Sequence, residues 1–431
     1  MTIAFTACIV LLLLLAALGM PIALAMIVSA IGYVALAGQD LSLPAEQMVQ
    51  GLYDNFIILA VPLFIVAANI MNAGSISDRL LRFCVALVGR FRGGLGLVNV
   101  VANIIFAGMS GSAVADAAGL GKVIIDMMRK DGRYPPGYAA AITAAASTIG
   151  PIIPPSIPMV MYSLVSNTSI GALFAGGVLP GLLMGLVLMA MNYVAARRRG
   201  FGLDEPVPLR EVPKLTVNAF PALLMPAILL YGIYGGVTTP TEAAAVAAFY
   251  ALLLAAIFYR ALSPRALYEV LRGSVMSSAS VGLIIGGALI FNYIVASENV
   301  PAKLQGFIDT LNVSPLAFLL IVNALVLLLG CLLDASTIIL VIVPLFLPTA
   351  KALGIDLVHF GVVIVVNCMI GLITPPYGVV LFVLNGITGI PLREMIREIW
   401  VFVGVLVLAL LIMILFPGVV LWLPHALGYK S

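Results

Sequence analysis

Residues 150–155 read Gly-Pro-Ile-Ile-Pro-Pro, and residues 371–376 read Gly-Leu-Ile-Thr-Pro-Pro. The two stretches share the frame Gly-x-Ile-x-Pro-Pro, lie 221 positions apart, and sit inside long apolar segments. Proline has no backbone donor and clashes with the preceding turn, so a Pro-Pro pair interrupts a helix. Lipid cannot satisfy the freed backbone groups, so such a break persists only where protein covers it or where it lines a polar cavity. Two breaks at matching places in two halves are typical of a transporter's binding site.

The composition is that of a membrane protein. Hydrophobic residues make up 63% of the 431 residues, charged residues make up 9%, and the mean hydropathy is +1.21. Soluble domains are about 25% charged, and apolar runs of about 20 residues can span a bilayer. We therefore expect an all-α polytopic membrane protein in a lipid bilayer. The net charge of +3, with no basic tail, argues against nucleic acid as a partner.

The second half of the chain repeats the plan of the first. Pro21 and Pro240, Gly108 and Gly330, and Gly132 and Gly354 are separated by nearly the same interval, which indicates an internal repeat. Each half is expected to hold about five spans, one re-entrant hairpin and one broken helix. The predicted parts are a first repeat over 1–199 (hairpin 95–128, broken helix 136–166), a cytoplasmic linker over 200–214, and a second repeat over 215–431 (hairpin 314–350, broken helix 357–388).

Basic residues set the expected orientation. Arginines cluster at 79–92, 129–133, 197–199, 260–272 and 393–397, and such clusters face the cytoplasm. About ten spans and two hairpins satisfy this rule if both termini lie outside. The two repeats would then be inverted, with hairpins that enter from opposite sides. Inverted repeats with helix breaks at the midplane indicate alternating access.

The helix breaks predict sodium sites. Carbonyls at the end of an interrupted half-helix, together with hydroxyls at a hairpin tip, suit a small hard cation. Na⁺ is favoured over a proton because a proton relay usually needs several intramembrane carboxylates or histidines, and only Asp116 and Asp334 lie near the tips. One site is predicted among Ser110, Ser112, Gly150, Ile153 and Pro155, and a second among Asp334, Thr337, Gly371, Thr374 and Pro376.

The same breaks predict an anion site. The second half-helix of each pair should begin near Ser156 or Tyr377, where free amides and partial positive charge favour a carboxylate. No arginine or lysine falls in these central segments. We expect the substrate to contact Ser110, Ser147, Ser156 and Asp334.

Plainer roles remain open for several of these residues. Ser110 and Ser112 could ease close helix packing. Asp116 could be a helix-terminal charge, and Asp334 could lie nearer the membrane surface than the midplane. Glu242 follows Thr239-Pro240-Thr241 and is interpreted as a helix cap.

One alternative belongs to another class of protein. Gly108-Met109-Ser110-Gly111 matches the Gly-x-Ser-Gly pattern of intramembrane serine proteases. That chemistry needs a base beside the nucleophile, and the two histidines, His359 and His425, are expected elsewhere. We therefore do not expect an enzyme; labelling of Ser110 by a covalent serine-directed probe would revive this alternative.

Three motifs resemble the large membrane subunit of TRAP (tripartite ATP-independent periplasmic) transporters. They are residues 108–116 (Gly-Met-Ser-Gly-Ser-Ala-Val-Ala-Asp), residues 147–156 (Ser-Thr-Ile-Gly-Pro-Ile-Ile-Pro-Pro-Ser) and residues 235–243 (Gly-Gly-Val-Thr-Thr-Pro-Thr-Glu-Ala). The resemblance covers nearly the whole chain. It implies an elevator-type transporter of the bacterial inner membrane that couples sodium to the import of an organic anion, such as a C4-dicarboxylate or a sialic acid.

The resemblance also implies partners. Members of the family work with a small four-helix membrane subunit, fused to the large subunit in some relatives and expected here as a separate polypeptide. A periplasmic substrate-binding protein delivers the anion. The resemblance also implies membership of a wider ion-transporter superfamily that includes sodium/dicarboxylate carriers. The main alternative is therefore a stand-alone sodium/dicarboxylate symporter of that superfamily, because the same transport core would serve both. A channel is disfavoured, since no charged ring or pore-lining repeat is evident.

Overall fold

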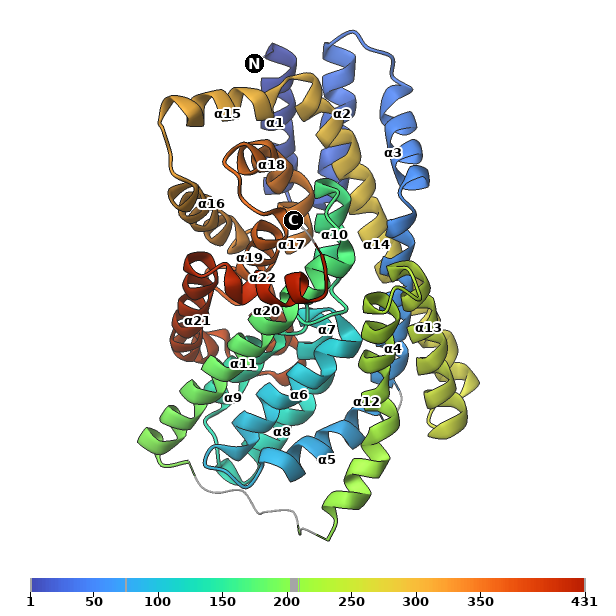
Figure 1. Cartoon of the computed structure of the whole chain (residues 1–431), viewed down its shortest axis with the longest axis vertical. Helices are drawn as coiled ribbons and strands as arrows, with labels where there is room; N and C mark the ends of the chain where they lie inside the picture. The colour runs from blue at the N-terminus through green and yellow to red at the C-terminus, as the bar shows by residue number, and fades with distance from the viewer. Residues whose placement is uncertain (1, 74–75, 202–207, 209, 430–431) are drawn as a thin grey trace.

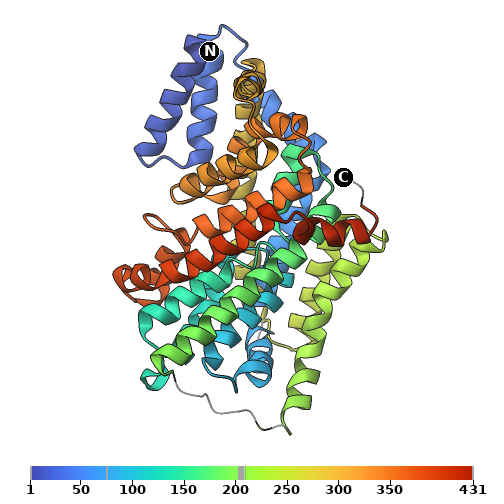
Figure 2. The same cartoon turned by 60° about the vertical axis from the view of Figure 1, so that its left-hand side comes forward.

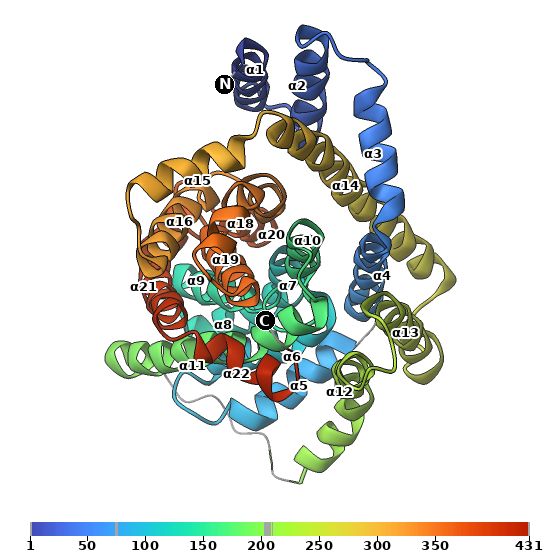
Figure 3. The same ribbon diagram turned by 45° about the horizontal axis from the view of Figure 1, so that its top comes forward.

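The computed structural model describes residues 2–73, 76–201, 208 and 210–429, and it contains no β-strand within these ranges (Figure 1). An outer layer of helices curves around one side of an inner bundle (Figure 3). The outer layer consists of α1 (Ile3–Ala17), α2 (Ile22–Leu36), α3 (Leu43–Asp54), η1 (Phe56–Leu59), α4 (Ala60–Ala73), α12 (Val212–Tyr234), α13 (Pro240–Leu253), η4 (Leu254–Phe258) and α14 (Pro264–Ser297).

The inner bundle is built from both halves of the chain (Figure 2). Two shorter helices, α5 (Ile76–Val88) and α15 (Val300–Thr310), connect it to the outer layer. The bundle consists of α6 (Gly94–Ser110), α7 (Ala113–Asp116), η2 (Ala117–Gly121), α8 (Lys122–Arg129), η3 (Lys130–Gly132), α9 (Pro136–Ser147), α10 (Ile157–Ser166), α11 (Ile170–Arg199), α16 (Pro315–Gly330), α17 (Ala335–Thr337), η5 (Ile338–Ile342), α18 (Val343–Ala352), α19 (Leu357–Gly371), α20 (Val379–Thr388), α21 (Leu392–Leu415) and α22 (Gly418–Ala426).

Several helices are long and apolar enough to cross a membrane. Seven described helices meet this criterion, among them α11, α14 and α21. Shorter apolar helices include α1, α2 and three of the four half-helices beside the Pro-Pro breaks, namely α10, α19 and α20. Helices α5 and α8, which carry arginines, lie at the lower end of Figure 1, opposite α1, α2 and α15. By the positive-inside rule the lower end is predicted to be the cytoplasmic side.

Both halves contain a hairpin of two apolar arms. In the first half, α6 ends at Ser110 and the chain turns through Gly111 and Ser112 into α7, η2 and α8. In the second half, α16 ends at Gly330 and the chain turns through 331–334 into α17, η5 and α18. The second arm of each hairpin begins with a short α-helical stretch and continues as a π-helical turn, η2 or η5. The elements of the two halves therefore occur in the same order; their inverted relation stays a prediction.

Both Pro-Pro segments interrupt a buried helix. Helix α9 ends at Ser147 and α10 begins at Ile157, while α19 ends at Gly371 and α20 begins at Val379. Both Pro-Pro peptide bonds are cis. The described residues of α9 and α19 are almost entirely buried. Protein also covers the first break, as the bilayer demands, whereas Pro376 and Tyr377 of the second break are exposed.

Side chains cap the helices that start inside the fold. Ser112 accepts from the Ala115 amide at 3.4 Å, and Ser156 accepts from the Met159 amide at 3.2 Å. A cap of this kind stabilises a helix by about 0.5–2 kcal/mol. The same chemistry explains Glu242: it forms a reciprocal capping box with Thr239, which confirms the interpretation of Glu242 as a cap.

Three features of the structure were not expected. Helix α14 extends over 34 residues, well beyond the roughly 20 that a membrane span needs, and α3 and α22 were not predicted at all. Helix α22 packs on α11 and α19, and α3 packs on α14. Both α3 and α22 are short, and packing against longer helices compensates for their length.

Candidate functional site

A cavity of about 290 Å³ lies where the two hairpin tips meet the outer layer. Residues 110–115 of the first tip and 334–336 of the second form two of its walls. Helix α10 and the residues beside both Pro-Pro breaks form the floor, and α4 and α14 close the cavity from the outer layer. The polar side chains that line it are Asn69, Ser110, Ser112, Ser277, Asp334 and Ser336.

The first hairpin tip touches the first helix break. Gly111 has a φ of 62°, in the left-handed region, and a side chain added there would come within 2.6 Å of the Pro155 carbonyl oxygen. Glycine is therefore required on both grounds, because a Cβ would be strained and would clash. The close approach brings Ser110, Ser112 and Pro155, three of the residues predicted for the first sodium site, to one place.

The second hairpin tip is organised by Asp334. Its carboxylate accepts from the Ser336 amide at 3.0 Å and the Thr337 amide at 3.3 Å, and also from the Thr337 hydroxyl. Asp334 is thus the N-cap of α17 while it also lines the cavity. Gly330 and Gly371 pack backbone to backbone, since a Cβ on Gly371 would lie 2.7 Å from Gly330 Cα. The second tip therefore sits directly on the second break.

Asp116 is a buried carboxylate. It is 2% exposed, and the Ser110 hydroxyl lies close enough to interact with its carboxylate, although no hydrogen bond of standard geometry reaches either carboxylate oxygen from the described residues. The Ser110 hydroxyl is likewise buried and makes no other side-chain hydrogen bond among the described residues. A Cβ on Gly150 would collide with Asp116 Oδ2, so the carboxylate lies against the first break. A carboxylate in this position is costly unless a cation or a proton joins it.

The sequence signal for Asp116 was present but ambiguous. A carboxylate six residues after Ser110, in an apolar hairpin arm, is compatible with either a helix-terminal charge or a site residue. The structure places Asp116 at the end of α7, directly before the π-helical turn η2, and buries it. Its burial and its contact with Gly150 add it to the candidate site.

Four other predicted residues lie behind the cavity wall. Ser147 donates to the Ala144 carbonyl at 2.9 Å, Ser156 donates to the Pro151 carbonyl, and Thr374 donates to the Ile370 carbonyl at 2.7 Å. All three are buried, as is Thr337. None of the four lines the cavity, so the structure does not place Ser147 or Ser156 against a substrate there.

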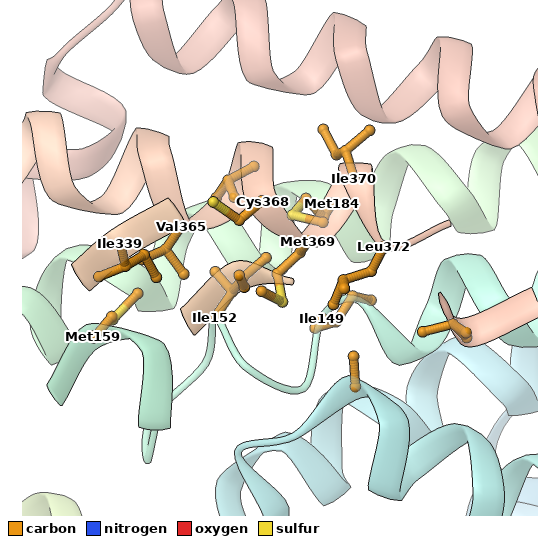
Figure 4. Packing of buried hydrophobic residues seen from close by; sticks show 14 of the residues in the cluster. Ile149, Ile152, Met159, Met184, Ile339, Val365, Cys368, Met369, Ile370 and Leu372 are labelled. Atoms are coloured by element: carbon orange, nitrogen blue, oxygen red, sulfur yellow. The ribbon is translucent and has the colours of Figure 1, made fainter. Parts of the chain in front are cut away.

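The remaining predicted residues belong to the breaks themselves. Ile153 packs against Gly181 of α11, where a Cβ would clash with it. Pro376 is exposed, unlike Pro155 in the first half, which is buried. Between the breaks, Ile149 and Ile152 lie beside Met369 and Leu372 from the other half (Figure 4). The two breaks therefore share one apolar core.

The donor set of this region limits its chemistry. No lysine, arginine or histidine that the structure describes lines the cavity, and the described residues contain no cluster of three His, Cys, Asp or Glu side chains that could hold a metal. His359 is buried with Nε2 2.9 Å from the Met413 carbonyl oxygen. Hydroxyls, carboxylates and backbone groups are what the region offers, and these suit a hard monovalent cation and a hydrogen-bonded anion.

A family model and two relatives that match this chain belong to one transporter family. A family model described as "Tripartite ATP-independent periplasmic transporter, DctM component" matches residues 9–419. The sialic acid TRAP transporter large permease protein SiaM of Vibrio cholerae is 41% identical over 95% of this chain and 96% of its own length. The C4-dicarboxylate TRAP transporter large permease protein DctM of Pseudomonas aeruginosa is 40% identical over 87% of this chain and 88% of its own length.

A solved structure supports the fold. The crystal structure of the Alcanivorax borkumensis YdaH transporter superposes with a TM-score of 0.63 over 86% of this chain and 87% of that chain, at 16% identity. At that identity the likeness concerns the fold alone. Together, the family match and the relatives show that the chain belongs to the DctM component of the tripartite ATP-independent periplasmic (TRAP) transporters, bacterial inner-membrane permeases that work with a small membrane subunit and a periplasmic binding protein.

Proposed function

We propose that this chain imports an organic anion, driven by sodium ions, after a periplasmic binding protein has delivered the anion. A separate small four-helix subunit would complete the membrane part. Relatives are named for sialic acid and for C4-dicarboxylates, and both are carboxylates. The observation that carries the proposal is the cavity between the two hairpin tips, which offers hydroxyls and helix starts but no cationic side chain.

The two sodium ions are assigned to the two contacts between a hairpin tip and a helix break. The first site uses Ser110, Ser112 and the backbone of Gly150, Ile153 and Pro155, and Asp116 supplies a negative charge beside Gly150. The second site uses the backbone of Gly371 and Pro376 with Asp334, Thr337 and Thr374. Sodium at the first site would compensate the buried Asp116 carboxylate, which forms no ion pair with a described residue and has only the Ser110 hydroxyl close by.

The anion is assigned to the cavity between these sites. Ser110, Ser112 and Asp334 line it. Bound sodium would reduce the repulsion between Asp334 and a carboxylate substrate, so cation and anion would bind cooperatively. Ser156 acts from behind the wall, because its hydroxyl holds the Pro151 carbonyl and its oxygen caps α10.

The Asp334→Asn variant tests the charge separately from the cap. Asparagine caps helices as well as aspartate does, so α17 should remain while the negative charge is lost. Sodium-driven uptake should fall roughly 5- to 150-fold, the range of a coupling energy of about 1–3 kcal/mol. The measurement is uptake of radiolabelled succinate and sialic acid into proteoliposomes that contain the chain with its small subunit and binding protein.

Asp356→Asn is the matched control. Asp356 caps α19 with bonds of 2.7 and 3.2 Å to the Val358 and His359 amides, and it does not line the transport cavity. Its variant should transport like the wild type. Wild-type sodium dependence in Asp334→Asn would remove this carboxylate from the mechanism. Uptake by the wild type without any binding protein would instead favour a stand-alone symporter.

A further inference from the structure

A second cavity, of about 640 Å³, lies between the outer layer and the first hairpin. Asn72 of α4 and Asp78 of α5 line one side, Gly119 of η2 lines another, and Tyr259 and Arg260 close it from the turn before α14. Arg260 is the only lysine, arginine or histidine among its lining residues. We call it the cytoplasmic cavity, because its helices lie on the side where the arginines cluster.

The cytoplasmic cavity continues the line of the transport cavity. Helix α4 contributes Asn69 to the transport cavity and Asn72, about one turn later, to the cytoplasmic cavity. The second arm of the first hairpin contributes Val114 and Ala115 to the first cavity and Gly119 to the second. The two cavities therefore follow the same two elements, one behind the other toward the cytoplasm.

The backbone holds Arg260 in an unusual conformation. Its φ is 48°, in the left-handed region that glycine or asparagine adopts at lower cost. The turn is fixed on both sides: the Tyr259 amide donates to the Leu254 carbonyl at 2.8 Å, and the Ala261 amide donates to the Ala255 carbonyl at 2.9 Å. The Tyr259 hydroxyl also donates to the Asn218 carbonyl at 2.8 Å. Backbone strain of this kind clusters at functional sites, and here it belongs to a residue that lines the cavity.

Arg260 gives one side of the cytoplasmic cavity a positive charge. Arg260 is exposed and makes no ion pair with a described residue. The guanidinium of Arg79 lies 4.5 Å from the Tyr259 ring centroid, behind the same wall. Asp78 is the opposing charge, and it stands in the first turn of α5, where the helix N-terminus offsets a carboxylate.

We propose that the cytoplasmic cavity is a release site for the anionic substrate, and that Arg260 is its anion-binding residue. The inference rests on the proposed function. An anion that leaves the transport cavity, which has no cationic side chain, would meet Arg260 as its first full positive charge among the residues lining the two cavities. Such a site would attract the anion away from the hairpin tips and would be weak enough to let it go, because Arg260 is exposed to water and screened by salt.

The first experiment measures the electrostatic potential in the cytoplasmic cavity and does not require the substrate to be known. Ser77, which lines the cavity, is replaced by cysteine in a Cys331→Ser background, and inside-out vesicles containing the full chain are labelled with an anionic and a cationic methanethiosulfonate. The anionic-to-cationic rate ratio should fall roughly three- to tenfold in Arg260→Asn, because one positive charge is lost nearby. Asparagine tolerates the left-handed turn.

Arg265→Asn is the matched control for labelling. Arg265 is an exposed arginine five residues away that does not line the cavity, so its loss should leave the ratio unchanged. Equal ratios in the Arg260→Asn and Arg265→Asn variants would overturn the assignment of Arg260.

The second experiment measures release. Proteoliposomes with the small subunit and binding protein are assayed with radiolabelled succinate and sialic acid. Arg260→Asn should slow net uptake several-fold without changing its dependence on external sodium, Arg260→Lys should retain most of the rate, and Arg265→Asn should match the wild type. Wild-type uptake by Arg260→Asn would overturn the release role. If the wild type itself shows no sodium-driven uptake of either anion, the proposed function fails, and the labelling ratio still decides whether Arg260 sets the potential.

Discussion

At the scale of single residues, Gly150 offers a sharp test of the first sodium site. Its missing side chain lets Asp116 approach the helix break, and a Cβ there would also lie 3.3 Å from the Ser147 carbonyl oxygen. Gly150→Ala should displace the carboxylate at an overpacking cost of about 1–3 kcal/mol, which corresponds to a weakening of sodium activation by roughly 5- to 150-fold. The measurement is the sodium concentration that gives half-maximal uptake.

Gly404→Ala is the neutral counterpart. Gly404 lies in α21 with nothing within 4 Å of the position of a Cβ, so its variant should keep the sodium dependence of the wild type. A Gly150→Ala protein that inserts normally and is activated by the same sodium concentration as the Gly404→Ala protein would separate Asp116 from the site.

The residues that the sequence alone could identify are those with an unusual backbone role. The glycine and prolines of the two breaks and the serines of the first tip are visible because each departs from an apolar background. The direction of a hydroxyl is not visible: Ser147 and Ser156 point to carbonyls of their own segments. Tertiary contacts decide that direction, and they also decide that Asp116 is buried against Gly150.

At the scale of elements, the Pro-Pro breaks should be indispensable. Replacing Pro375 and Pro376 by alanine restores two backbone donors and removes the clash with the preceding turn, so α19 and α20 should join into one helix. Transport should then fall to background while the protein still inserts. Pro221→Ala is the matched control, because Pro221 lies within a continuous helix, α12, and its carbonyl keeps the bond from the Tyr250 hydroxyl. Normal uptake by the double variant would take the break out of the mechanism.

The sequence predicts an element where a residue type such as glycine or proline determines the backbone conformation. It does not predict an element whose conformation depends only on packing. The hairpin tips and breaks carry glycine and proline at the turn, and helices were expected on both sides of them. The π-helical turns η2 and η5, by contrast, contain no such residue pattern in common. A widened turn of one extra residue changes the hydrophobic period too little to be read from a sequence.

At the scale of the whole molecule, an elevator requires the inner bundle to slide along the outer layer. A Cβ on Gly119 of η2 would lie 3.8 Å from Cγ of Asn72 in α4, so cysteines at both positions can be bridged across the boundary. Oxidation of the Asn72→Cys/Gly119→Cys protein, in a Cys331→Ser background, should stop transport, and a reductant should restore it.

A Gly51→Cys/Leu289→Cys bridge is the control: a Cβ on Gly51 would lie 3.3 Å from Leu289 Cγ, and both residues belong to the outer layer, so oxidation should leave transport intact. The Asn72→Cys and Gly119→Cys single variants are also alkylated with N-ethylmaleimide. If the alkylated single variants still transport, the loss of transport in the oxidised double variant is due to the cross-link and not to a blocked cytoplasmic cavity. Full transport by the oxidised Asn72–Gly119 protein would mean that the inner bundle does not move past α4.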